Sequence, residues 1–270
     1  MAGRDDVVGN QFLQGLAVQG RVIGALILRE TRTRFWKNRL GYLWAIVEPV
    51  LHIATWFMIM TIVTINPQMD RSRNLLFLVT GLLPYFAFRN VAQFMETAIV
   101  ANQALLNFPI VRHFDLILAR FLLESATMII VTVIIVGGLV ALKLSDLPDD
   151  MPGTSIGFAF SLMLGFGFGM FNAVFTHLSL IYKKVLDMSS RIFYYCSGVM
   201  VSIESLPGDL RDILIWNPIA HAVELFREFY FPLHQSSFAS ASYVFNWALG
   251  LALVGFVSAR LAGERLSRPP

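Results

Sequence analysis

The feature that most constrains the fold is the junction of a basic cluster with a long apolar segment in residues 28–65. The apolar segment runs from Tyr42 to Ile65. Just before it, the eleven positions 29–39 hold five basic side chains: Arg29, Arg32, Arg34, Lys37 and Arg39. A bilayer core of roughly 30 Å needs about 20 helical residues, and a basic cluster beside a first span is retained on the cytoplasmic side. The junction therefore predicts a membrane-spanning chain with its N-terminus inside.

The composition agrees with this prediction and excludes several other classes of protein. Mean hydropathy is +0.63 and only 14% of the residues are charged, against about 25% in soluble domains. The one cysteine, Cys196, excludes an internal disulfide, and the five histidines lack the spacing of a metal site. The net charge of +3 is distributed by membrane side and does not form one face, so we expect no nucleic-acid partner.

The apolar segments predict an all-α membrane protein with six transmembrane helices. Their approximate bounds are 42–65, 75–100, 115–142, 154–182, 186–203 and 242–261. We expect residues 42–262 to form one transmembrane domain, preceded by a cytoplasmic part, 1–41, and followed by a cytoplasmic tail, 263–270. The polar first ten residues have no secretory signal character. From Phe12 to Leu28 apolar residues recur at three- and four-residue steps, which favours an amphipathic helix in the membrane interface, or a short soluble helix docked on a partner.

The distribution of basic residues predicts that both termini are cytoplasmic. In this topology fifteen of the 21 Lys and Arg residues lie on the cytoplasmic side, and five lie outside. The remaining one, Arg89, falls within the second span, whose second half also carries Asn90, Gln93 and Glu96. Because these are too many polar residues for a lipid-facing helix, we expect that half to face protein, water or a substrate path.

We also predict an ion pair between Glu48 and Arg89. At 1.5 Å per residue, Glu48 lies roughly 10 Å from the inner boundary and Arg89 about 20 Å from the outer one. These depths coincide in a core of roughly 30 Å, where a lone charge costs about 2.5 to 3.5 kcal/mol. The alternative is that Glu48 reaches interfacial water, while Arg89 snorkels or faces the substrate path.

The fourth span carries three glycines, Gly165, Gly167 and Gly169, and we expect Gly165 and Gly169 to allow close helix packing. Their spacing lacks the Lys-Ser/Thr of a phosphate-binding loop and lies inside an apolar run. Small residues at such spacing let helix backbones approach each other in membranes. We therefore expect no ATP site in this chain.

Three stretches carry a resemblance to a known family. They are Leu28 to His52 with its Glu48-Pro49, Ala101 to Asn107 with Ala119-Arg120, and Trp216-Asn217-Pro218 through Arg227-Glu228. In the same order along nearly the whole chain, they resemble the membrane subunit of ABC-2-type polysaccharide exporters, and most of all the group 2 capsule export permease. The chain departs from the family at Leu105 and Leu106, where Arg and Lys often precede the Phe-Pro of the first cytoplasmic loop.

The resemblance implies a permease with no ATP site of its own. It would form a homodimer bound to two copies of a cytoplasmic ATPase, which holds ATP and Mg. The complex would move a lipid-anchored capsular polysaccharide across the inner membrane of a Gram-negative bacterium, working with a periplasmic adaptor or co-polymerase and an outer-membrane channel. The family's segment before the last span, here 204–241, folds as short re-entrant helices.

The candidate site residues fall into four groups. The basic cluster is expected where substrate and lipid enter, or to anchor to phospholipid alone. Rings and charges within spans are candidates for the channel, although interfacial belts and packing explain most membrane aromatics: Trp44, Glu48, Tyr85, Phe86, Phe88, Arg89, Tyr194 and Tyr195. The loop 101–114 is expected to couple to the ATPase, or to be a simple turn, through Asn107, Phe108, Pro109 and Arg112. A periplasmic gate, or a docking site for the adaptor, is expected at Glu204, Trp216, Asn217, Pro218, Glu224 and Arg227.

Two other functions stay open from the sequence. The first is another ABC-2-type permease, for O-antigen, teichoic acid, lipid or drug export. The second is a membrane glycosyltransferase acting on lipid-linked sugars. Such an enzyme needs exposed carboxylates or a nucleotide-sugar domain, and the loops here are short.

Overall fold

A computed structural model describes residues 2–36, 41–63, 71–108, 110–232 and 234–266, and all regular structure in these ranges is helical. The long helices are α1 (Ala2–Trp36), α2 (Gly41–Val63), α3 (Arg71–Glu96), α5 (His113–Ala141), α6 (Met151–Leu178), α7 (Leu180–Tyr195), α9 (Pro218–Tyr230) and α10 (Ala241–Leu261). The short ones are α4 (Ala98–Ala101), η1 (Gln103–Asn107), η2 (Ile203–Ser205), α8 (Gly208–Leu214) and α11 (Gly263–Leu266). The predicted all-α class is confirmed.

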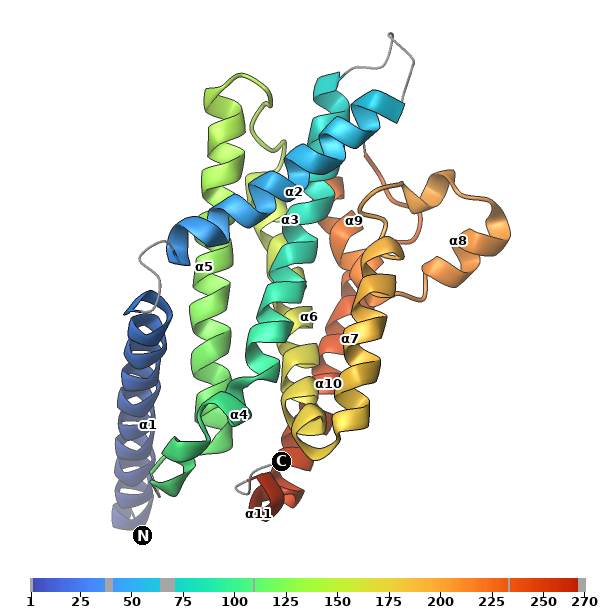
Figure 1. Ribbon diagram of the computed structural model, residues 1–270. Helices are drawn as coiled ribbons and strands as arrows, with labels where there is room; N and C mark the ends of the chain where they lie inside the picture. The colour runs from blue at the N-terminus through green and yellow to red at the C-terminus, as the bar shows by residue number, and fades with distance from the viewer. Residues whose placement is uncertain (1, 37–40, 64–70, 109, 233, 267–270) are drawn as a thin grey trace.

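Within the described ranges, five helices are long and apolar enough to cross a membrane: α2, α3, α5, α6 and α10. They overlap the first four predicted spans and the last one. Figure 1 shows α3, α5, α6 and α10 as a bundle, with α2 crossing its face and α1 beside the lower part of α5. The start of α1 and the whole of α11 lie at the same end of this bundle, which also carries α4.

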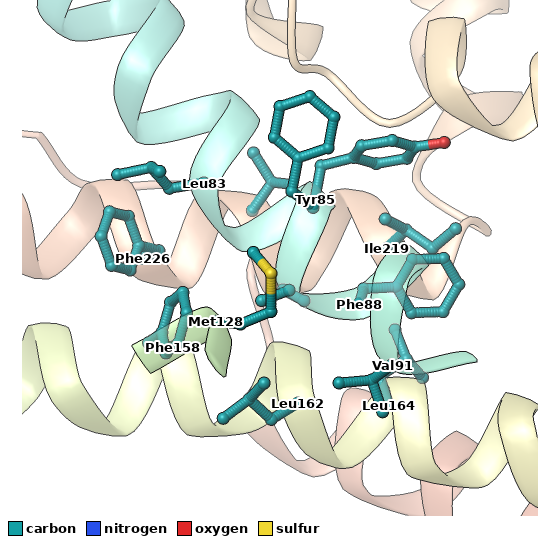
Figure 2. Packing of buried hydrophobic residues seen from close by; sticks show 14 of the residues in the cluster. Leu83, Tyr85, Phe88, Val91, Met128, Phe158, Leu162, Leu164, Ile219 and Phe226 are labelled. Carbon is teal, nitrogen blue, oxygen red and sulfur yellow. The ribbon is translucent and has the colours of Figure 1, made fainter. Parts of the chain in front are cut away.

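Helix α6 is the centre of the bundle, because it packs on α3, on α10 and on α9. Figure 2 shows the resulting core, in which side chains of α3, α6 and α9 interdigitate with Met128 of α5. The α3 residues Leu78 and Leu82 are 0% exposed. Helix α2 has the opposite character, since only 11% of its most apolar window is buried, against 72% for α3. Its apolar surface is therefore available to lipid or to another chain.

Gly165 and Gly169 of α6 allow this close packing, as predicted, and Gly167 does so on the other face. A Cβ added to Gly165 would lie 2.8 Å from the Phe88 carbonyl oxygen, and one on Gly169 would lie 2.7 Å from Cβ of Met95, both on α3. On the other face, a Cβ on Gly167 would lie 2.4 Å from the carbonyl oxygen of Ala248 on α10. In the same contact, a Cβ added to Gly255 of α10 would lie 2.8 Å from the Met170 carbonyl oxygen of α6. These contacts bring three backbones together where a larger side chain has no space.

The fifth predicted span, 186–203, does not form one continuous helix in the structure. Helix α6 ends at Leu178, and the Ser179 hydroxyl accepts a bond from the Tyr182 N–H, so that α7 starts earlier than the predicted span. Helix α7 then ends at Tyr195, and Gly198 has a φ of 70°, in the left-handed region. A count of six spans is therefore not confirmed.

We expect Gly167→Ala to lower the free energy of unfolding by about 1–3 kcal/mol, because the added methyl group overpacks a backbone contact that cannot move aside. The measurement is thermal unfolding of the protein purified in detergent. Gly250→Ala is the matched control, since a Cβ there meets nothing within 4 Å. Equal unfolding temperatures for the two variants would contradict the packing of α6 on α10.

Candidate functional site

A groove lies between α3, α6 and α7, and its lining combines aromatic rings with polar side chains. The rings are Tyr85, Phe88, Phe168 and Phe193, and the polar groups are Arg89, Gln93, Glu96, Asn172, Asp187 and Ser190. The α3 members recur at steps of three and four residues, so they form one helical face. Aromatic faces with adjacent donors and acceptors can both stack on and hydrogen-bond to a sugar.

The predicted ion pair between Glu48 and Arg89 is confirmed at the edge of this groove. Arg89 Nη2 lies 3.1 Å from Glu48 Oε1, with the two side chains 30% and 45% exposed. Arg89 Nε also donates to Gln93 Oε1 at 3.3 Å, and the guanidinium lies 5.5 Å from the centre of the Phe86 ring. The pair joins α2 to α3 and keeps a charged, partly exposed surface within the span region.

A second polar contact joins α2 to α7. His52 Nε2 lies 2.7 Å from the Tyr194 hydroxyl, and Trp56 Nε1 donates to the same nitrogen at 3.2 Å. The Tyr194 ring packs edge-on against Tyr85 of the groove, at 5.0 Å between ring centres. His52 had no assigned role in the sequence, because its partner lies 142 residues away.

Two bonds fix the start of α7 at the other end of the groove. Lys183 Nζ lies 3.0 Å from Glu96 Oε1, which lies at the end of α3. The Tyr182 hydroxyl donates to Asn172 Oδ1 of α6 at 2.7 Å. Glu96 and Asn172 both line the groove, so this end is bounded by charged and polar groups.

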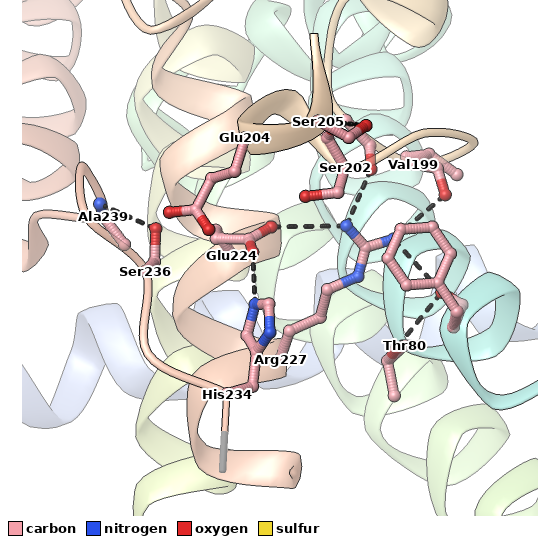
Figure 3. Close-up of polar contacts among 12 residues, drawn as sticks. Thr80, Val199, Ser202, Glu204, Ser205, Glu224, Arg227, His234, Ser236 and Ala239 are labelled. Carbon is pink, nitrogen blue, oxygen red and sulfur yellow. Dashed lines mark hydrogen bonds and ion pairs between the residues drawn. The ribbon is translucent and has the colours of Figure 1, made fainter. Parts of the chain in front are cut away.

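At the opposite end of the bundle, Arg227 of α9 is fully buried at 0% exposure. Figure 3 shows its guanidinium between α9 and the chain that follows α7. It donates to the carbonyl oxygens of Gly198 at 2.7 Å, Val199 at 3.0 Å and Phe77 at 3.1 Å. It also pairs with Glu224 Oε2 at 3.3 Å and lies over the Phe77 ring at 3.8 Å. A charge-assisted cluster of this kind stabilises the turn that ends α7.

Two further contacts hold the loop between α9 and α10. His234 is hydrogen-bonded to the second oxygen of the Glu224 carboxylate (Figure 3). Glu204 Oε1 accepts from the Ser237 N–H at 2.6 Å and from its hydroxyl at 2.9 Å. Of the other predicted gate residues, Asn217 caps α9 and Pro218 is its first residue, while Trp216 is 73% exposed.

A third cluster, which the sequence did not predict, joins α1 to the segment after α3. Glu30 of α1 accepts bonds from Arg120 Nε at 3.1 Å and Asn102 Nδ2 at 2.6 Å. Arg120 also donates to Thr97 Oγ1 at 2.7 Å, and it is 5% exposed. The signal in the sequence that could have indicated this cluster is Arg120 itself, because an arginine within a predicted span needs a partner for its charge.

The predicted basic cluster is only partly described. Arg29 donates to Asn102 Oδ1 at 2.5 Å, so it belongs to the Glu30 cluster, and Arg32 is exposed. Arg34, Lys37 and Arg39 lie outside the residues whose side chains the structure describes. A role for this cluster in substrate access stays a prediction.

The other predicted residues are placed as follows. Among channel candidates, Tyr85, Phe88 and Arg89 line the groove, Phe86 is 1% exposed, and Trp44 and Tyr195 are 62% and 65% exposed. In the predicted coupling loop, Asn107 at the end of η1 and Phe108 after it are exposed, and Pro109 lies outside the described residues. Arg112 precedes α5 and lines a different cavity. The roles of all these residues stay predictions.

Comparison with known proteins gives one family and several relatives. The ABC-2 type transporter family matches residues 21–231. The polysialic acid transport protein KpsM of Escherichia coli is 35% identical over 93% of this chain and 97% of its own length. The capsule polysaccharide export inner-membrane protein BexB of Haemophilus influenzae is 31% identical over 91% of this chain and 92% of its own. The capsule polysaccharide export inner-membrane protein CtrC of Neisseria meningitidis is 31% identical over 90% and 92%.

We expect Glu48→Arg and Arg89→Glu each to impair assembly or function, because each leaves two like charges side by side in a medium where an unpaired charge is costly. The double variant, which restores an opposite pair, should recover part of the loss. Protein level and function measured in membranes check this. No recovery, with both proteins normally inserted, would show that Arg89 acts through something other than Glu48.

We expect the loop between α9 and α10 to loosen as pH rises. The hydrogen bond to Glu224 raises the pKa of His234 above its ordinary value of 6.5, although burial opposes the shift. A raised folded pKa means that the bond contributes fully below about pH 6.5 and is lost as pH rises through the folded pKa. Hydrogen exchange of the peptide 231–240, followed from pH 6 upward, measures this.

The control for the pH dependence is His234→Gln. This variant keeps a donor for Glu224 but has no group that titrates in this range. Exchange in the variant, corrected for the intrinsic rate, should be independent of pH. An identical pH dependence in both proteins would exclude His234 as its source.

Proposed function

Because this chain belongs to the ABC-2 type transporter family, we propose that it is the membrane-spanning permease of a capsule polysaccharide exporter. The observation that carries this function is the similarity to KpsM, BexB and CtrC, at 31–35% identity along at least nine-tenths of the chain. The chain is a multi-pass inner-membrane protein, in agreement with its five apolar helices. It exports capsular polysaccharide, as the names of BexB and CtrC state for those proteins.

The finer features of the proposal concern the partners. The permease is a homodimer bound to two copies of a cytoplasmic ATPase, which carries ATP and Mg. Membership of the ABC-2 type transporter family supports a separate ATPase partner. The poorly buried α2 offers apolar surface for a second copy. A periplasmic adaptor or co-polymerase and an outer-membrane channel complete the export path.

The proposed topology has both termini in the cytoplasm. Fifteen of the 21 basic residues lie on that side in the predicted arrangement, which supports it. The position of α11 beside the end where α1 starts (Figure 1) agrees with an even number of crossings. The fifth crossing combines α7 with the chain from Cys196 to Ile203, and α8 and α9 enter the membrane from outside without crossing it.

In this arrangement the groove between α3, α6 and α7 contacts the passing polymer. Its rings stack on sugar faces. Arg89 attracts acidic groups of the polymer, and the Glu48 carboxylate partly neutralises the positive charge of Arg89. The cluster of Arg227, Glu224 and His234 lies at the end away from α11 and holds α9 where the polymer leaves. We propose that α8 and α9 close this end when no glycan is bound.

The function is tested by replacing the capsule permease of a strain whose export has been abolished by deletion. We expect the chain, together with its ATPase, to restore surface polysaccharide, and lipid-linked capsular glycan to stimulate ATP hydrolysis by the purified complex. Stimulation by O-antigen, teichoic acid or drugs, with none by capsular glycan, would favour another ABC-2-type exporter. Glycan synthesis by this chain without an ATPase would favour the glycosyltransferase.

We predict that residues 101–114 transmit the movement of the ATPase. Phe108 is 58% exposed on this loop, as a contact residue must be. A cysteine at Phe108 should crosslink to the ATPase, whereas one at Leu142, 70% exposed and beyond the other end of α5, should not. Cys196 is replaced in both variants. Absence of the Phe108 crosslink in an assembled complex would count against this coupling contact.

A further inference from the structure

A cavity of about 570 Å³ lies at the end of the bundle that carries α11, apart from the groove. Its lining includes Arg112 and His113 at the start of α5, and Phe256 and Arg260 near the end of α10. Gln19 of α1 and Met170 of α6 also line it. A volume of this size is typical of small-ligand sites, which span about 300–1,000 Å³.

The charged lining of this cavity is cationic. In the described part of the chain, neither the Arg112 nor the Arg260 guanidinium takes part in an ion pair with a carboxylate. The nearby Asp115 carboxylate already accepts from the Arg112 backbone N–H at 3.0 Å and from Gln19 Nε2 at 2.9 Å. His113 Nε2 is buried and has no hydrogen-bond partner among the described residues. The cavity thus has unused donors for an anion.

The apolar lining consists of aromatic and thioether side chains. The Phe114 and Phe256 rings meet edge-on at 5.7 Å, and Arg260 lies 5.5 Å from the centre of the Phe256 ring. On the outside of α10, Leu253 and Val257 are 54% and 52% exposed, next to the cavity along the helix. A ligand with a charged head and long hydrocarbon chains is complementary to this surface.

The position of the cavity indicates which kind of anion can reach it. Arg112 directly precedes the candidate span His113–Ala141, and Arg260 lies in the last turn of the span Ala241–Leu261. Both guanidinium groups are therefore at the ends of spans, where phospholipid head groups lie. Guanidinium groups bind phosphate through charge-assisted, often bidentate, hydrogen bonds.

We infer that this cavity binds the phosphate head group of an anionic membrane phospholipid. Arg112 and Arg260 hold the phosphate, and the acyl chains follow the apolar side of α10. Because Gln19 and Arg112 belong to different segments, the bound lipid also joins α1 to the start of α5. This role gives Arg112 a function besides the predicted contact with the ATPase.

The test is native mass spectrometry of the full-length protein in nonionic detergent, titrated with phosphatidylglycerol or with phosphatidylcholine of the same acyl chains. We expect the wild-type protein to retain one phosphatidylglycerol per chain and to prefer it over phosphatidylcholine. Arg112→Gln/Arg260→Gln should weaken the binding of phosphatidylglycerol about tenfold or more, since two charge-assisted bonds are lost. The same lipid should raise the Tm of the wild-type protein but not that of the double variant.

Lys184→Gln is the matched control, because it removes an exposed positive charge at the start of α7, away from the cavity lining. It should bind phosphatidylglycerol as the wild type does. The single variant Arg260→Gln replaces the double variant if the latter does not fold. Three results with lipids would each overturn the inference: equal binding of the two lipids, an equal loss of phosphatidylglycerol binding in Lys184→Gln, or unchanged binding in the arginine variants. Equally tight binding of inorganic phosphate alone would also overturn it.

Discussion

The buried guanidinium of Arg227 connects three segments that are distant in the sequence. It belongs to α9, and it donates to a carbonyl of α3 and to two carbonyls of the chain after α7. Gly81 makes this possible, because a Cβ there would lie 2.4 Å from Arg227 Nη2 and 2.8 Å from the Val199 carbonyl oxygen. This charge, at 0% exposure, is compensated by the bonds that Nη1 and Nη2 donate to carbonyls and to Glu224, while Nε has no hydrogen-bond partner among the described residues. The end of α7, the position of α9 and the bend at Gly198 therefore depend on one another.

The packing of α6 is the second constraint, and it places the groove. Its glycines bring the backbones of α3 and α10 close on two faces, so that α3 presents the Tyr85–Glu96 face toward α7. The end of the groove near Lys183 and Glu96 is fixed by an ion pair, and its middle contacts α2 through Arg89 and Glu48. The face of α3 that lines the groove therefore carries polar groups, Arg89, Gln93 and Glu96, among aromatic and small side chains.

The clusters at the two ends of the bundle differ in what they connect. At the α11 end, Glu30 and Arg120 join α1 to α5 beside the exposed loop after η1. Arg120 also donates to the Phe94 carbonyl of α3 and to Thr97 Oγ1, so the same set of bonds connects α1, α3 and α5. At the other end, the contact between His234 and Glu224 holds the loop between α9 and α10. One end is thus joined by the Arg120–Glu30 ion pair, and the other has a His234–Glu224 contact that protonation can change.

The sequence alone determined the membrane class, the position of most long helices and the family, because these depend on the length of apolar runs and on local motifs. It also predicted the Glu48–Arg89 pair and the close packing at Gly165 and Gly169, since helical rise and small side chains fix depth and approach distance. It did not predict the contacts of Glu30 with Arg120 or of His52 with Tyr194, whose partners are 90 and 142 residues apart.

Only the tertiary structure decided where α7 ends, because local hydropathy continues past Tyr195 while the carbonyls of Gly198 and Val199 bond to Arg227. The cavity lined by Arg112 and Arg260 likewise depends on α1, α5, α6, α10 and α11 meeting, and no local pattern encodes that meeting. A periodic sequence specifies which residues share a face of a helix. Which faces then meet is set by packing and by the pairing of buried charges across the whole bundle.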